Sequence, residues 1–159
     1  MTAWRMGAAA LLAFVPAVLQ AEAPVANPPL PAITVTLTPG GHVHRYSIEV
    51  ARSVDEQARG LMVRRTMPRD HGMIFPMDPP RDTAFWMEGT ALPLDLVFIA
   101  PGHVVQRIAA DAKPFDRTHI PSDGPVEAVL ELNAGEAARI GLRPGDRVGY
   151  TLDGGVDRR

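Results

Sequence analysis

The stretch from Phe85 to Ile99 constrains the fold more than any other part of the chain. It ends in an uninterrupted apolar run, Leu96 to Ile99, which follows a Thr-Ala-Leu-Pro turn and a single acidic residue, Asp95. A short apolar run bounded by turn residues is typical of a strand buried on both faces. Asp95 therefore begins a buried strand, where a carboxylate must find a cation and donors or take up a proton. We expect another segment to supply its partner.

Short segments with alternating apolar residues predict a mainly β domain around that strand. Further extended segments are expected at residues 33–37, 42–51, 73–75, 83–87, 103–108, 126–132 and 147–152, with residues 76–82 as a loop. The chain lacks the strand-helix-strand alternation of a doubly wound parallel sheet. We predict an α+β fold, mainly β, in the form of a small antiparallel barrel or sandwich with two short helices.

The two helices are expected near residues 53–62 and 134–140. Ser53 with Glu56, and Asn133 with Glu136, have the spacing of a capping box, in which the first residue caps the helix. In the first helix, an apolar stripe is expected to pack on the sheet and consists of Val54, Ala58, Leu61 and Met62.

The N-terminal segment has the layout of a secretory signal. Arg5 precedes an apolar run from Ala8 to Leu19, and small residues follow at Ala21 and Ala23. We expect cleavage after Ala21 and a periplasmic or secreted protein; the alternative is an uncleaved membrane anchor. Residues 22–32 are then a proline-rich linker, residues 33–152 a single compact β-rich domain and residues 153–159 a polar tail.

Charge and cysteine content restrict the partners. The formal net charge is −2, and it becomes −3 if Arg5 is removed with the signal. This balance gives no electrostatic case for nucleic acid. We expect no cofactor and, after removal of the signal, no membrane association; the expected partner is a small polar ligand or an envelope protein. The chain has no cysteine, so its core must hold the fold without disulfides.

A series of sequence blocks resembles the bacterial and archaeal family called domain of unknown function 192. In order, the blocks are Ile48-Glu49-Val50-Ala51, Gly60-Leu61-Met62 with Arg64, Gly72-Met73-Ile74-Phe75, Phe85-Trp86-Met87, Thr90, Pro93-Leu94-Asp95, Val129 to Gly135 and Gly145-Asp146. The resemblance covers about residues 46–150. It implies membership of a family without an assigned activity. The chain has Glu88 and Gly89 where the family usually reads Lys-Asn in Trp-Met-Lys-Asn-Thr, so a role of that lysine or asparagine does not carry over.

Several of these residues are candidates for a shallow ligand pocket: Arg64, Arg65, Trp86, Met87, Thr90, Asp95 and Glu131. Asp95 has two interpretations. It orients a ligand or acts as a base, or it forms a structural ion pair with Arg64 or Arg65 that joins the first helix to the central strand. We predict an arginine within hydrogen-bonding distance of Asp95. Residues 111–125 form a long irregular connection and are a candidate cover for the pocket.

Two further acids lie in the middle of predicted strands. Alternation places Glu49 and Glu131 opposite the apolar faces, where they are either solvated or line a groove opposite Arg64. Asn133 is interpreted as a helix cap.

The chain carries no nucleophile elbow, His-Glu-x-x-His motif or phosphate loop. The leading interpretation is therefore a non-catalytic, exported binding or accessory module for a polar ligand; its catalytic residues, if any, are unknown. One alternative is a copper-binding envelope protein that uses His71, Met73 and Met77, since thioether and imidazole groups suit Cu(I), although methionine also fills cores. The other is a hydrolase-like enzyme with Asp95 or Glu131 as base.

Overall fold

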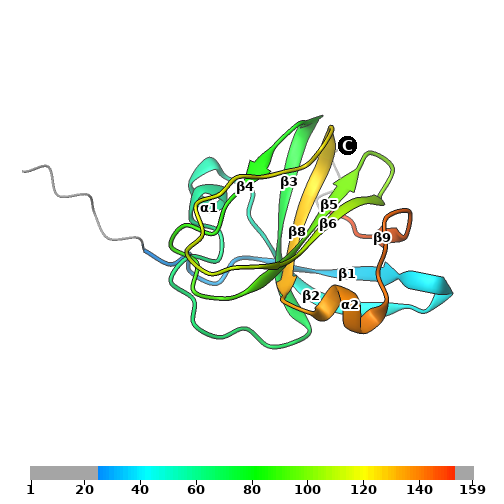
Figure 1. Ribbon diagram of the computed structural model, residues 1–159, viewed down its shortest axis with the longest axis horizontal. Coiled ribbons are helices and arrows are strands. Elements are labelled where there is room, and N and C mark those ends of the chain that lie inside the picture. The colour runs from blue at the N-terminus through cyan, green and yellow to red at the C-terminus, as the bar shows by residue number, and fades with distance from the viewer. Residues whose placement is uncertain (1–24, 153–159) are drawn as a thin grey trace, which may run out of the picture.

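Seven strands close into a barrel in the order β1-β2-β3-β8-β5-β6-β9 (Figure 1). The computed structural model describes residues 25–152. The barrel strands are β1 (Ala32–Thr38), β2 (His44–Val50), β3 (His71–Arg81), β5 (Leu94–Ala100), β6 (Val104–Ala112), β8 (Val126–Asn133) and β9 (Arg147–Gly149). A two-stranded sheet is formed by β4 (Ala84–Phe85) and β7 (Ile120–Pro121), and the helical elements are η1 (Pro39–Gly41), α1 (Val54–Arg59) and α2 (Glu136–Ile140). The predicted mainly β fold with two short helices is confirmed.

One strand pair differs from the others in direction. β2 and β3 are parallel, whereas every other pair in the described part of the chain is antiparallel. Parallel neighbours need a crossover connection, and here α1 lies in that connection. The crossover carries α1 away from the barrel axis and onto the side of β3 (Figure 1).

Alternation along the strands separates two apolar clusters. The inner cluster fills the barrel and includes Ile74 of β3, Val97 of β5 and Leu130 of β8. Their sequence neighbours point the other way and form an outer cluster, which includes Met73 and Leu96. The strands β3, β5 and β8 are therefore buried on both faces along much of their length. This is the arrangement that the apolar run Leu96 to Ile99 predicted, and all four of its residues are fully buried.

The expected loop at residues 76–82 is instead largely strand. β3 continues to Arg81 and pairs with β8 at Pro76 and at Arg81, with a register shift between them. A proline cannot donate to a ladder, but an irregular pairing does not require a donor at each position. The prolines therefore mark an irregularity within β3 and not its end.

The predicted N-terminal cap is confirmed for α1 and is wrong for α2. Ser53 and Glu56 form the expected capping box, and the helix ends at Gly60. The predicted apolar stripe is wrong within the helix, since Val54 is 83% exposed and Ala58 is exposed as well. Of its four residues Leu61 is buried, and it lies beyond the end of the six-residue helix. The predicted cap by Asn133 is also wrong, since Gly135 occupies the N-cap position of α2 without a side-chain cap.

The segment before β1 lies against the domain. Asn27 is buried and donates from Nδ2 to the carbonyls of Glu56 and Gly60, at 2.9 and 3.0 Å. The Leu30 amide donates to the Glu49 carboxylate. Chain contacts with the fold thus begin within the segment expected to be a linker. The expected signal at residues 1–21 and the tail at 153–159 lie outside the described residues.

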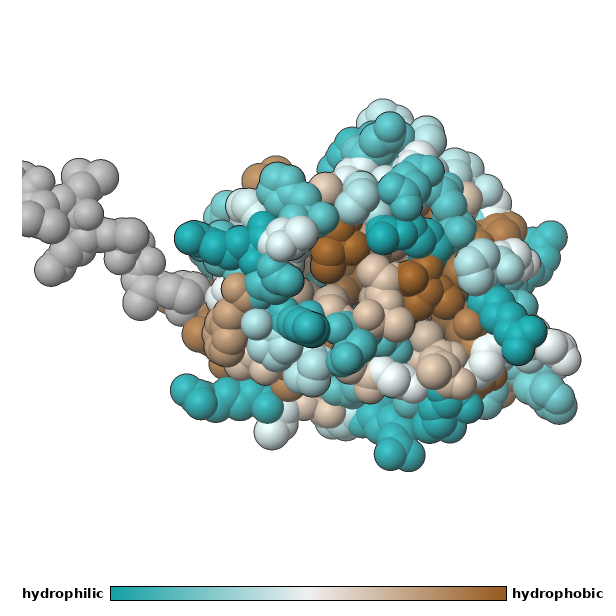
Figure 2. Space-filling model, viewed as in Figure 1, coloured by the Kyte–Doolittle hydropathy of each residue, from teal (hydrophilic) through white to brown (hydrophobic). Residues whose placement is uncertain are grey.

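The surface has both polar and apolar areas. On the face viewed in Figure 2, apolar side chains gather near the middle and hydrophilic ones surround them. Within residues 25–152, no helix is long and apolar enough to cross a membrane.

Candidate functional site

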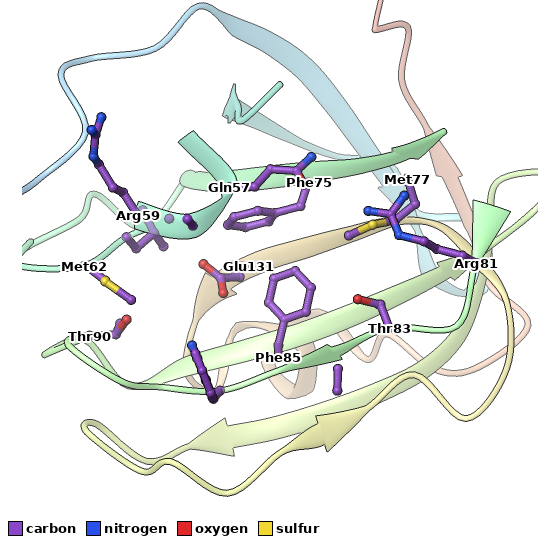
Figure 3. Close-up of a pocket in the computed structure, with 15 residues that line it drawn as sticks. Gln57, Arg59, Met62, Phe75, Met77, Arg81, Thr83, Phe85, Thr90 and Glu131 are labelled. Carbon is purple, nitrogen blue, oxygen red and sulfur yellow. The ribbon is translucent and has the colours of Figure 1, made fainter. Parts of the chain in front are cut away.

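A cavity of about 270 Å³ lies between α1, the outer face of β3 and β8, and the segment around β4. Figure 3 shows Glu131 near its centre, with Met62 and Thr90 at one end and Arg81 and Thr83 at the other. Its lining is mainly apolar and aromatic, and the side chains used below are Met62, Phe75, Met77, Phe85, Trp86 and Glu131. An apolar cavity with few polar groups is the usual form of a small-molecule site.

Glu131 is the acidic group of this cavity. Register places it between Met73 of β3 and Leu96 of β5, both of which belong to the outer apolar cluster. The residue is only 5% exposed, and burial raises the pKa of its carboxyl to about 8. In the described part of the chain, no hydrogen bond or ion pair is made to this carboxyl, whose oxygens face the cavity and keep some contact with solvent. Glu131 is thus a buried acid whose partner is not supplied by the surrounding side chains.

Aromatic rings form one wall of the cavity. Phe75 and Phe85 pack edge to face, with ring centroids 5.0 Å apart and an interplanar angle of 83°. Phe85 makes a second perpendicular contact with Phe98 beneath it, at 6.4 Å. The contacts fix the orientation of Phe85 beside Glu131. Trp86 lies further out, is 47% exposed and packs against the His119 ring at 5.4 Å.

Glu49 has a protein partner, unlike Glu131. Arg64 donates to its two carboxylate oxygens at 2.5 and 2.8 Å, and both side chains are largely buried. The hydrogen bonds from Arg64 hold the pKa of Glu49 below its ordinary value. Alternation correctly predicted that Glu49 and Glu131 point away from the barrel interior, but neither is simply solvated, because α1 and the chain after it cover that face.

The predicted ion pair between Asp95 and Arg64 or Arg65 is wrong. Asp95 is fully buried, as expected, but three backbone amides satisfy its carboxylate: Asp111 at 3.0 Å, Gly135 at 3.1 Å and Ala137 at 2.9 Å. Two of these amides lie at the start of α2, so Asp95 supplies from a neighbouring strand the cap that Asn133 was expected to provide. Asn133 instead donates to the carbonyls of Met67 and Pro68.

The other candidate residues divide between the cavity and the core. Trp86, Thr90 and Glu131 line the cavity. Met87 is buried in the outer apolar cluster, and Arg65 is exposed; neither lines the cavity. Asp95 is enclosed by its amide partners and is unavailable as a base or ligand group.

Sequence reasoning missed much of the cavity wall. Phe75 and Met77 follow the alternation of β3 and share the outward face with Met73, so a local signal for their direction existed. Arg59 and Arg81 at the rim carried no local signal, since the crossover and the irregular part of β3 bring them to opposite ends of the same cavity.

The cover of the cavity is α1, and the predicted cover at residues 111–125 is wrong. None of those residues lines the cavity. The segment is held instead by backbone hydrogen bonds to residues 83–90, among them Met87 N to Asp116 O and Ser122 N to Thr83 O. It supports the cavity wall from behind. The helix α1 is attached through Gln57, which donates to the carbonyls of Ala51 and Pro76.

The copper alternative does not fit the geometry. His71 and Met77 are six residues apart on β3, which corresponds to about 20 Å along a strand, so one ion cannot bind both together with Met73. Met73 is fully buried in the apolar cluster, and His71 contacts Asp70. Across residues 25–152, no group of three or more His, Cys, Asp or Glu side chains is placed to hold a metal ion.

A family model matches residues 35–150, which is most of the chain. The chain belongs to the DUF192 family. The description of DUF192 is "Uncharacterized ACR", so membership assigns no activity. The resemblance expected from the sequence blocks is thereby confirmed.

Two solved structures share the DUF192 chain's fold. A protein of unknown function from Novosphingobium aromaticivorans DSM 12444 is 44% identical, with a TM-score of 0.75 over 82% of this chain and 94% of that chain. A proposed transcription regulator from Sinorhizobium meliloti 1021 is 38% identical, with a TM-score of 0.76 over 78% of this chain and 97% of that chain. The comparison with curated proteins finds no match.

Proposed function

We propose that this DUF192 protein is a non-catalytic binding module for a small ligand that has an apolar body and one polar group. The apolar body occupies the cavity beneath α1, and the polar group meets Glu131. One observation carries this proposal: the carboxyl of Glu131, a residue that is 5% exposed, faces a cavity of about 270 Å³ and has no partner among the described residues. An unpaired buried polar group is costly to keep, and a ligand that pairs with it removes that cost.

The walls favour a ligand that is more apolar than the small polar ligand expected from the sequence. Phe75, Phe85, Met62 and Met77 provide apolar contact, and methionine adapts to ligands of different shape. Thr90 provides a polar side chain at the end of the cavity where Met62 lies. Its hydroxyl donates one long hydrogen bond, 3.5 Å, to the Glu88 carbonyl.

A fragment screen on the full chain tests the proposal. We expect fragments that bind in the cavity to shift the NMR signals of the Met62 and Met77 methyl groups. We expect Glu131→Gln to weaken the affinity of these fragments by about tenfold or more. Asp82→Asn is the matched control, because it removes one negative charge next to the rim residues Arg81 and Thr83 without changing the lining. Hits that bind elsewhere, or that bind Glu131→Gln with unchanged affinity, would contradict the proposal.

An enzyme that uses Glu131 as general acid or base is the second candidate. Burial raises the pKa of this carboxyl to about 8, and a proton held near neutral pH is what such catalysis needs. Each fragment hit is therefore incubated with the protein in D₂O and re-examined by NMR. Recovery of an unchanged fragment, with no deuterium incorporated at carbon, supports the binding module; chemical change that depends on Glu131 supports the enzyme.

We also propose export through the N-terminal segment, on the basis of Arg5 and the apolar run from Ala8 to Leu19. Mass spectrometry of the protein recovered from the cell envelope tests this, since cleavage after Ala21 predicts a mature chain that begins at Glu22. A nucleic-acid role, such as the description of the Sinorhizobium protein would imply, is not proposed, because the formal net charge is −2.

A further inference from the structure

We propose that the polar group of the ligand is an amine cation, which forms an ion pair with the Glu131 carboxylate inside the aromatic cavity. This inference rests on the proposed function and specifies its ligand class. The expected ligand is a protonated primary or secondary amine that carries an apolar group.

The first argument concerns what a carboxyl offers that other side chains do not. A hydroxyl or an amide in the same position would hydrogen-bond a neutral ligand at a smaller cost of burial. A carboxyl can also ionise, and within residues 25–152 no cation is paired with it. Arg64 is committed to Glu49 through two hydrogen bonds. The guanidinium of Arg59 points away from Glu131 (Figure 3).

The second argument concerns the walls around the carboxyl. The rings of Phe75 and Phe85 lie close to Glu131, and Trp86 also lines the cavity (Figure 3). The faces of aromatic rings carry a negative quadrupole and attract ammonium groups, more strongly where water is excluded. The thioethers of Met62 and Met77 are polarisable and apolar, so they accept the body of an amine without competing for its N–H groups.

The charged groups around Glu131 do not replace such a ligand. From α1 and from the end of β3, Arg59 and Arg81 line the rim, but both are exposed and screened by solvent. Glu49 of β2 and Arg64, which lies between α1 and β3, neutralise each other. Asp95, the charged residue of β5, accepts hydrogen bonds from three backbone amides.

Binding of an amine must be linked to a proton. In the free protein at pH 7, Glu131 holds its proton, because burial raises the pKa of its carboxyl to about 8. The entering ammonium group requires the carboxylate, so the Glu131 proton is released to solvent as the ion pair forms. Affinity should therefore rise with pH, by about tenfold per pH unit below the pKa of Glu131.

Three probes of similar size test the inference on the full chain: 2-phenylethylamine, 2-phenylethanol and 3-phenylpropanoate. We measure affinity by calorimetry at pH 6, 7 and 8, in buffers of different ionisation enthalpy, and locate binding through the Met62 and Met77 methyl signals. We expect the amine to bind at least about tenfold more tightly than the alcohol at pH 8 and to release close to one proton at pH 7. In Glu131→Gln this preference and the proton release should disappear, while Asp82→Asn should keep both. Arg81→Gln should bind the amine as well as the wild type or slightly better, since it removes a like charge at the rim.

The outcomes separate the inference from the proposed function. If the alcohol binds in the cavity as tightly as the amine, or the propanoate binds best, the amine assignment is overturned and a small-molecule site at Glu131 stands. If none of the probes shifts the methyl signals, the amine assignment is again overturned, and the fragment screen decides the proposed function separately. Unchanged methyl signals elsewhere in Glu131→Gln show that the variant is folded.

Discussion

Arg64 donates two hydrogen bonds to Glu49, at 2.5 and 2.8 Å. Glu49 and Glu131 lie in one cross-strand row, separated by Met73, so their backbones are about 10 Å apart. Two acids thus share the outer face of the barrel, but the described residues supply a cation to Glu49 and none to Glu131. This difference in pairing is the reason why we assign Glu49 a structural role and propose Glu131 for a ligand.

Loss of the Arg64 side chain should destabilise the fold in a pH-dependent way. Because Arg64 lowers the pKa of Glu49 in the folded state, the pair stabilises the protein above the unfolded pKa of about 4.3. This contribution is lost as the pH falls through the lower folded pKa. We expect Arg64→Gln to reduce the free energy of unfolding by about 1 to 2 kcal/mol at pH 7 and by much less at pH 3. Urea unfolding at both pH values measures this; an equal loss at both would show that lost packing, and not charge, is responsible.

Glu131 should have the opposite pH dependence. Its folded pKa is raised, so its contribution to stability is full below the unfolded pKa of about 4.3 and is lost as the pH rises through about 8. Glu131→Gln cannot ionise. We expect the variant to match the wild type near pH 4 and to become more stable than it by up to about 5 kcal/mol at pH 9. Chemical unfolding of both proteins across this range gives the difference directly, and a constant difference would mean that Glu131 does not titrate abnormally.

Asp95 should be the most sensitive carboxylate for stability. Asp95→Ala would leave the buried amide of Ala137 and the partly buried amides of Asp111 and Gly135 without their acceptor. We expect a loss of about 3 to 5 kcal/mol in the free energy of unfolding. Asp116→Asn is the control, because that exposed carboxylate accepts its hydrogen bonds from the nearby residue Thr118, and the substitution should cost less than about 1 kcal/mol. Similar melting temperatures for the two variants would contradict this role of Asp95.

Gly72 allows β8 to approach β3 beside Glu131. A Cβ at this position would lie 2.3 Å from the Glu131 carbonyl oxygen and 2.8 Å from Cδ1 of Ile48. We expect Gly72→Ala to cost about 3 kcal/mol or more, because the backbone of β8 cannot move without disturbing both apolar clusters. Gly102→Ala is the comparison. Its Cβ would meet nothing within 4 Å, and only the φ of +89° opposes it, so about 1 to 2 kcal/mol is expected by thermal unfolding.

Local patterns predicted the features that depend on neighbours in sequence. The run Leu96 to Ile99 identified the strand buried on both faces, Ser53 with Glu56 identified the start of α1, and alternation gave the direction of Glu131. Each of these depends on contacts within a few residues or on the two-residue period of a strand. They were sufficient to predict a mainly β fold.

Features that depend on distant segments were not predictable in this way. The burial of Asp95 followed from its strand, but its amide partners lie 16 to 42 residues away in sequence. Arg64 was the expected partner, yet the crossover from β2 to β3 brings it to Glu49. The same crossover places α1 over the face of the sheet that carries Glu131. Glu131 therefore lines a cavity instead of facing bulk solvent. In each case the tertiary arrangement decides between partners that are chemically equivalent.

The helix α1 covers the cavity but buries none of its own side chains. Its attachments beyond its own turn are polar: Gln57 donates to Ala51 and Pro76, and Asn27 donates to the carbonyls of Glu56 and Gly60. Water can replace hydrogen bonds of this kind at little cost, whereas it cannot replace apolar packing. We therefore expect α1 to open more readily than the barrel, with the buried Leu61 that follows it as the fixed point, and such a motion would widen the entry to the carboxyl of Glu131.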